Sequence, residues 1–278
     1  MTVLQSIVLG IVQGLTEFLP ISSSGHLVFI PKIFGWVDQG IGFDVMVHLG
    51  SLLAVIIYFR KLLWKILKSF FIKNEPLPNP PLRGEGTNYR RLGWLIILTI
   101  IPAGVVGLLF GDWIETNLRS SMVIGIGLIF WGLVLYIAER YQCRSQITDH
   151  RSLKNIGWRN ALFIGCAQAI ALIPGTSRSG ITMTAGLFSK LDKKSAAEFS
   201  FLMSVPIIML AGGLNLLELI QKGLGDLNLV VLVAGFVAAA VSGFVAIAGL
   251  MKIIQKWSFK PFVLYRIVVG IIILFFLK

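Results

Sequence analysis

Charged residues are scarce in this chain. Only 14% of its 278 residues are Asp, Glu, Lys or Arg, and 56% are hydrophobic, whereas a typical soluble domain has about a quarter charged residues. Four ranges contain no charged residue at all: 92–111, 120–138, 199–217 and 227–251. Since roughly 20 apolar residues suffice for a helix to cross a bilayer, these ranges exclude a soluble protein and predict an all-α integral membrane protein.

Cysteine is also rare, and acidic residues are few. Cys143 lies in a basic loop and Cys166 in an apolar stretch, a placement that predicts neither a disulfide nor a metal site.

The N-terminus has no basic start and no small-residue cleavage site, so we expect residues 1–30 to belong to the mature protein. The net charge is +12, which in a soluble protein would suggest a nucleic-acid partner.

The positions of the basic residues instead describe a membrane topology. Six full transmembrane helices are predicted at about 43–64, 91–111, 120–140, 195–219, 227–251 and 261–277. The segments 60–91, 140–159, 190–194 and 252–260 hold eight, five, three and three lysines and arginines, which is 19 of the 25. By the positive-inside rule these segments face the cytoplasm. No nucleic-acid partner is therefore expected.

Two apolar segments, 1–35 and 157–190, do not fit as full spans. Each is interrupted near its middle by proline and small polar residues and must return to the side it left, which is typical of a re-entrant helix–loop–helix hairpin. The first is expected to enter from outside and the second from the cytoplasm. The order of one hairpin followed by three spans occurs twice, in halves of about 1–140 and 150–278. Because three is an odd number, the two halves have opposite orientation, which predicts an inverted-topology repeat within a single membrane domain, 1–278. Residues 73–90 are expected to contain a flexible cytoplasmic loop.

Each hairpin carries a polar island at its break. The first, from Gln13 to His26, reads QGLTEFLPISSSGH, and the second, from Gln168 to Gly180, reads QAIALIPGTSRSG. At one offset of 155 residues, Gln13 matches Gln168, and Ser24-Gly25 matches Ser179-Gly180. Ionisable groups at membrane depth are costly and are functional candidates by default. The islands are therefore the predicted site.

The residue types in the islands point to an anion. Gln13 and Glu17 are four residues apart and share a helix face. Pro20 ends that helix, and serines 22–24 open the next, whose N-terminal backbone amides favour an anion. Arg178 in the second island offers a planar fork of donors suited to phosphate. If the islands meet, they form one pocket with an anion cradle, a carboxylate able to bind a divalent metal, and a hydroxyl and an imidazole for nucleophilic or acid–base work.

The segments QGLTEFLPISSSGH and PGTSRSGIT resemble the two signature regions of the undecaprenyl-pyrophosphate phosphatases, the bacitracin-resistance family of integral membrane proteins. The similarity extends over essentially the whole chain, including FVLYRIVVG at 262–270. Position 13 is Gln where some members have Glu, which leaves one metal-binding carboxylate fewer. The resemblance implies hydrolysis of undecaprenyl pyrophosphate to undecaprenyl phosphate and inorganic phosphate, which recycles the lipid carrier of bacterial cell-wall synthesis and confers bacitracin resistance.

The resemblance also implies roles for individual residues. Glu17 and Gln13 would hold a divalent cation, Mg2+ or Ca2+, and the pyrophosphate, while Arg178 would bind the phosphoryl oxygens. Ser23 would be the nucleophile and His26 its base or the leaving-group acid, with His26 itself or an activated water as the alternative attacking group. The other substrate-binding candidates, which we call the phosphate cradle, are Ser22, Ser24, Gly175, Thr176, Ser177, Ser179 and Thr182.

A transporter or flippase of a lipid phosphate or small anion is the alternative function, because paired re-entrant hairpins also occur in transporters. Such a carrier needs a cationic clamp but has little use for Glu17 beside the same anion. The resemblance implies a multi-pass protein of the bacterial plasma membrane whose partners are a polyprenyl pyrophosphate lipid and the bilayer. The topology predicts an active site open to the extracytoplasmic side. The oligomeric state is left open, a homodimer included.

Overall fold

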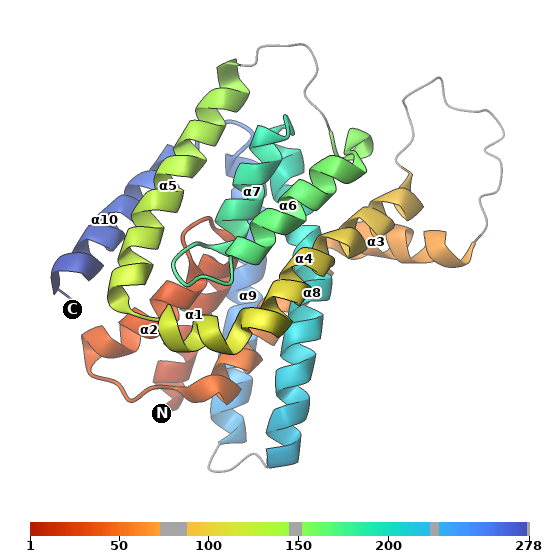
Figure 1. Cartoon of the computed structure of the whole chain (residues 1–278). Helices are drawn as coiled ribbons and strands as arrows, with labels where there is room; N and C mark the ends of the chain where they lie inside the picture. Colours follow the sequence, from red (N-terminus) through yellow and green to blue (C-terminus); the bar gives the residue numbers. More distant parts are fainter. Residues whose placement is uncertain (73–87, 145–151, 223–227, 277–278) are drawn as a thin grey trace, which may run out of the picture.

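The computed structural model describes residues 1–72, 88–144, 152–222 and 228–276 (Figure 1). Within these ranges the regular structure is helical, with no strand. The elements in order are α1 (Val3–Phe18), α2 (Ser23–Phe34), α3 (Gly40–Phe71), α4 (Tyr89–Asn117), α5 (Ser121–Arg144), η1 (Leu153–Asn155), α6 (Trp158–Ile170), α7 (Arg178–Phe188), α8 (Lys193–Lys222), α9 (Leu229–Ile253) and α10 (Lys260–Phe276).

Five helices are long and apolar enough to cross a membrane: α3, α4, α5, α8 and α9. They coincide with five of the six predicted spans, so the all-helical, multi-pass class is confirmed. The sixth predicted span corresponds to α10, which has 17 described residues and is not among these five. Its full crossing stays a prediction. Of the predicted loop 73–90, residues 73–87 lie outside the described residues, and Asn88 already caps α4.

Both predicted hairpins are pairs of helices that break where the sequence indicates. We call residues 19–22, between α1 and α2, the first tip, and residues 171–177, between α6 and α7, the second tip. A proline lies in each tip, and proline ends a helix because it lacks an N–H and clashes with the preceding turn. Each tip also ends on a serine in the left-handed region, with φ of 73° at Ser22 and 71° at Ser177. These serines are 155 residues apart, so the backbone repeats at the same offset as the sequence.

Glycines place the first tip by letting α1 lie close to α9. A Cβ on Gly10 would collide with the carbonyl oxygen of Gly235, and one on Gly14 with Ser242 and the carbonyl oxygen of Ala239. Such small-residue contacts let membrane helices approach closely without a hydrophobic driving force between them. Because α9 also packs on α3, the first hairpin is held inside the bundle.

The helix pairs form matching contacts. α1 packs on α9 as α6 packs on α4, while α5 lies beside α10 and α3 contacts α8 (Figure 1). If α1–α5 and α6–α10 are equivalent halves, the first two contacts are the same contact made twice. The last two then join each helix to its own counterpart. The inverted repeat remains a prediction, and this pairing favours it.

Candidate active site

The two hairpins meet at their tips through an ion pair between Glu17, just before the first tip, and Arg178, just after the second. Arg178 Nη2 lies 2.7 Å from Glu17 Oε1, and the two side chains are 15% and 7% exposed. Glu17 is in the last turn of α1 and Arg178 is the first residue of α7, so the pair joins the two hairpins. Ser179 Oγ also donates to the carbonyl oxygen of Leu19 at 2.9 Å. The expectation that the islands meet is confirmed.

Fixed neighbours orient both members of this pair. Glu17 Oε2 accepts hydrogen bonds from Gln13 Nε2 at 3.0 Å and from Ser23 Oγ at 2.6 Å. Arg178 Nη1 donates to the carbonyl oxygen of Ser200 in α8 at 3.1 Å. A hydroxyl donating to a carboxylate at this distance can transfer its proton there. The geometry therefore places Glu17, and not His26, within reach of the Ser23 proton.

His26 points toward α10 instead. Its Nδ1 donates to the carbonyl oxygen of Ser22 at 2.7 Å, so in the neutral ring Nε2 accepts from the hydroxyl of Tyr265, 2.6 Å away. The two rings are nearly parallel, with centroids 5.7 Å apart. Among the described residues, His26 makes no hydrogen bond to Ser23. In this arrangement the imidazole is held by α2 and α10, and the expected pairing of His26 with Ser23 is not seen.

The serines of the phosphate cradle repeat one arrangement in both tips. Ser22 Oγ lies 3.4 Å from Ser24 Oγ, and Ser177 Oγ lies 3.3 Å from Ser179 Oγ. The two caps differ, because Ser177 Oγ accepts from the backbone N–H of Gly180 whereas the Ser22 side chain caps no amide. Uncapped amides at a helix start attract anions. The start of α2 is thus suited to a phosphate.

The other cradle candidates support Arg178 or shape the second tip. Thr182 Oγ1 donates to the carbonyl oxygen of Arg178 at 2.8 Å and lies 2.7 Å from Ser200 Oγ. Thr176 is fully buried, and its hydroxyl has no hydrogen-bond partner within the described ranges. Gly175 has a φ of 86°, a backbone conformation that residues other than glycine rarely adopt.

Sequence reasoning did not select three residues that touch this centre: His48, Ser200 and Tyr265. His48 Nε2 lies 3.8 Å from Glu17 Oε2, and its Nδ1 donates to the carbonyl oxygen of Asp44. The one available signal was the spacing of Asp44 and His48 on one helix face, but such a pair near a span end usually lies at the membrane interface.

The oxygen atoms around Glu17 fit a divalent cation in part. Carboxylate, amide and hydroxyl oxygens are the ligands that Mg2+ and Ca2+ prefer. Gln13 Oε1 is buried without a hydrogen-bond partner in the described structure, while Gln13 Nε2 and Ser23 Oγ both donate to Glu17 Oε2. Among the described residues, no group of three or more His, Cys, Asp or Glu could hold a metal. A cation here would therefore need phosphate oxygens and water as further ligands.

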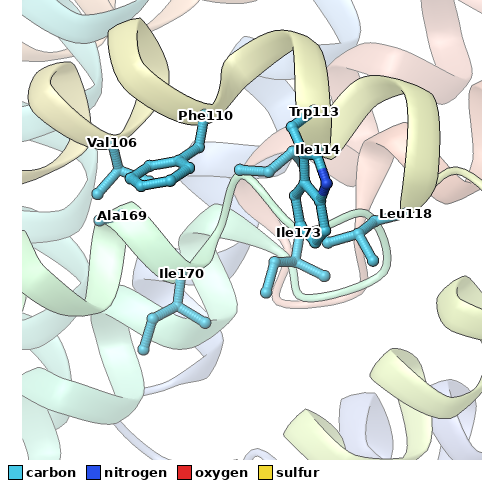
Figure 2. Close-up of a pocket in the computed structure, with 8 residues that line it drawn as sticks. All are labelled: Val106, Phe110, Trp113, Ile114, Leu118, Ala169, Ile170 and Ile173. Atoms are coloured by element: carbon cyan, nitrogen blue, oxygen red, sulfur yellow. The ribbon is translucent and has the colours of Figure 1, made fainter.

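An apolar groove lies between α4, α6 and the second tip. Its volume is about 270 Å³, and Figure 2 shows side chains of α4 facing those of α6 and the tip. Ile173 of the tip is four residues before Ser177, where the Ser-Arg-Ser sequence begins. The full lining consists of Val106, Phe110, Trp113, Ile114, Leu118, Ala169, Ile170 and Ile173. A lining that is apolar except for the indole N–H of Trp113 suits a hydrocarbon chain at this place.

Comparison with known proteins identifies the family. The model of the family described as bacitracin resistance protein BacA matches residues 6–272. The chain is 46% identical over 275 residues to undecaprenyl-diphosphatase 2 of Stutzerimonas stutzeri, covering 99% of this chain and 98% of the relative. It is 44% identical over 279 residues to undecaprenyl-diphosphatase of Campylobacter curvus, covering 99% of each. With agreement over nearly its full length, the chain belongs to the bacitracin resistance protein BacA family.

Proposed function

We propose that this chain is an undecaprenyl-diphosphatase that hydrolyses undecaprenyl pyrophosphate to undecaprenyl phosphate and inorganic phosphate, recycling the lipid carrier of bacterial cell-wall synthesis. The observation that carries the proposal is the Glu17–Arg178 pair where the two tips meet. A buried guanidinium is costly unless an anion faces it, and Glu17 stands where a phosphate oxygen would bind. The relatives carry the name of a diphosphatase, which favours hydrolysis over the transporter alternative.

The proposed reaction begins at Ser23. Its oxygen attacks the terminal phosphorus, the bond from that phosphorus to the bridging oxygen breaks, and undecaprenyl phosphate leaves. The Ser23 proton passes to Glu17, 2.6 Å away, which hands it to the bridging oxygen of the leaving group. Water then attacks the phosphoserine, releases inorganic phosphate and returns a proton to Ser23. The alternatives are attack by His26 itself and attack by a water that His26 activates.

Arg178 and Glu17 exchange partners in this proposal. Arg178 leaves the carboxylate for the phosphoryl oxygens and stabilises the charge that develops on them during transfer. Thr182 and the Ser200 carbonyl hold Arg178 in place during the exchange. Glu17 Oε1, which Arg178 has released, and Gln13 would then hold Mg2+ or Ca2+, while Glu17 Oε2 takes the Ser23 proton. The cation would neutralise charge on the diphosphate. His26, oriented by Tyr265, lies ready to move a proton.

We place this centre in a protein of six spans and two re-entrant hairpins, opening to the extracytoplasmic side of the bacterial plasma membrane. The basic segments described above and the matching helix pairs support this topology. A cysteine at position 38 should react with a membrane-impermeant label from outside, and a cysteine at position 80 only after the cytoplasmic side is opened, in a background without Cys143 and Cys166. Reversed labelling would overturn the sidedness.

The apolar groove beside the second tip is the proposed path of the polyprenyl chain into the bilayer. It lies next to the second tip, which Arg178 follows directly, and its lining is almost entirely apolar. A diphosphate held between the tips would place its first isoprene units at Ile173. This arrangement gives a physical reason for building a phosphatase inside a membrane, because the chain never has to leave an apolar environment.

The decisive experiment measures phosphate release from undecaprenyl pyrophosphate by the purified protein. Release should require a divalent cation, and Arg178→Ala or Glu17→Ala should abolish it. Arg140→Ala, which removes an exposed arginine at the far end of α5, is the matched control and should retain activity. Release that survives either site substitution overturns the site assignment. Movement of the lipid across liposomes without phosphate release overturns the enzymatic function.

A further inference from the structure

A second arginine, Arg266 of α10, is fully buried at the same meeting point. It is 0% exposed and the largest of the fully buried side chains within the described ranges. Its guanidinium donates only to backbone carbonyl oxygens: Pro20 of the first tip at 3.3 Å, Gly175 and Thr176 of the second tip at 3.1 and 2.9 Å, and Gly127 and Leu128 of α5 at 3.4 and 3.1 Å. One side chain thus links both tips to α5.

No carboxylate within the described residues lies within 4.0 Å of Arg266. Carbonyl oxygens carry only partial charges, so the positive charge of Arg266 is solvated but not neutralised. Burying an ion without a counter-ion costs several kcal/mol, and a hydrophobic residue would pack a bundle at lower cost. The tips therefore bring together one carboxylate, Glu17, and two guanidiniums, an excess of positive charge that suits a polyanion.

The surrounding backbone is shaped for this guanidinium. A Cβ on Gly180 would lie 2.7 Å from Arg266 Nη1, and a Cβ on Gly132 would lie 3.3 Å from Arg266 Cβ. Gly180 is in the first turn of α7, two residues after Arg178. The Arg266 guanidinium and the first turn of α7, which carries Arg178, are therefore packed against each other. A displacement of one is expected to displace the other.

We propose that Arg266 is a positioning residue for hydrolysis: it joins the two tips through their carbonyl oxygens, sets the approach of Arg178 to Glu17, and adds unneutralised positive charge for the diphosphate. The planar fork donates from three nitrogen atoms to five carbonyl oxygens in three segments, whereas an ammonium has only three donors, all on one atom. The proposal rests on the proposed diphosphatase function and adds a residue that makes no contact with the reacting atoms.

Arg266→Lys and Arg266→Met separate geometry from charge. The lysine keeps the charge but loses the fork, so kcat for undecaprenyl pyrophosphate should fall at least 10-fold while KM stays within about threefold. The methionine loses both, so kcat should fall and KM should rise at least 10-fold. Ile273→Ala, which opens a cavity at another buried position of α10, is the control for mere destabilisation. It should lower the thermal unfolding midpoint and leave kcat unchanged.

A second test leaves both charges in place and covers the case in which the Arg266 variants do not fold. Gly180→Ala pushes on Arg266 Nη1 and should lower kcat at least 10-fold, whereas Gly104→Ala, with no atom within 4 Å of the added Cβ, should not. The proposal is overturned if folded Arg266→Lys or Gly180→Ala has wild-type kcat, or if Ile273→Ala lowers kcat as much. Failure of the diphosphatase function itself would appear differently, as a wild-type protein that releases no phosphate.

Discussion

Replacing Glu17 by Gln should tighten the binding of inorganic pyrophosphate while removing hydrolysis. In the wild type the anion has to displace Glu17 from Arg178, to which it is bonded at 2.7 Å. A hydrogen bond to a charged group contributes about 1.5–3 kcal/mol; the pair with charges on both sides lies at the upper end of this range, and a guanidinium bonded to a neutral amide lies at the lower end. The difference, roughly 1–2 kcal/mol, corresponds to about 5- to 30-fold tighter binding in Glu17→Gln.

The measurement is isothermal titration calorimetry of the detergent-solubilised protein with pyrophosphate in excess EDTA, so that no cation links the anion to Glu17. Glu139→Gln is the matched control. Glu139 is also buried, at 4% exposure, and is paired with Lys193 at 2.6 Å, but its other partners are Ser258 and Phe259. Its replacement should leave the pyrophosphate Kd unchanged. Weaker binding by Glu17→Gln in EDTA would refute the idea that Glu17 and phosphate compete for Arg178.

Four further outcomes follow from individual contacts. Ser23→Ala should lower kcat at least 100-fold without unfolding the protein, and retained turnover would indicate direct attack by water. Tyr265→Phe, which removes the donor to the imidazole, should lower kcat about 10-fold, and an unchanged rate would exclude a role for that bond. Gly14→Ala overpacks the α1–α9 contact and should destabilise by about 1–3 kcal/mol in thermal unfolding, unlike Gly104→Ala. Ile170→Trp should fill the apolar groove and raise KM for undecaprenyl but not for geranyl pyrophosphate, and equal KM values for both would exclude the groove.

The two islands share some residues and differ in others. Because the candidate catalytic residues are among those that differ, individual residues indicated the site and the internal repeat did not. At the offset of 155, Ser22 corresponds to Ser177 in sequence and in backbone geometry. The same offset pairs Ser23 with Arg178 and Glu17 with a leucine. The shared residues build the tips, and the differing ones supply the chemistry. A repeat therefore predicts the scaffold, while opposite charges on the two copies predict that they face each other.

Contacts between distant helices were not predictable in the same way. His26 and Tyr265 are 239 residues apart and meet because α10 passes the start of α2. His48 reaches Glu17 only because α3 lies beside α1. The sequence shows that such polar residues exist in apolar segments. A hydropathy pattern cannot predict which side chain from a distant helix each of them contacts.

The sequence alone predicted the five helices that are long and apolar enough to cross a membrane and the break within each helix pair, because hydrophobic length and proline act locally. It also determined which residues could carry the chemistry, since ionisable groups in apolar helices are rare. Only the tertiary structure decided their partners: Glu17 with Arg178 across 161 residues, and Arg266 with both tips. Glycine contacts between helices set these meetings, and close packing depends on the shape of both surfaces together.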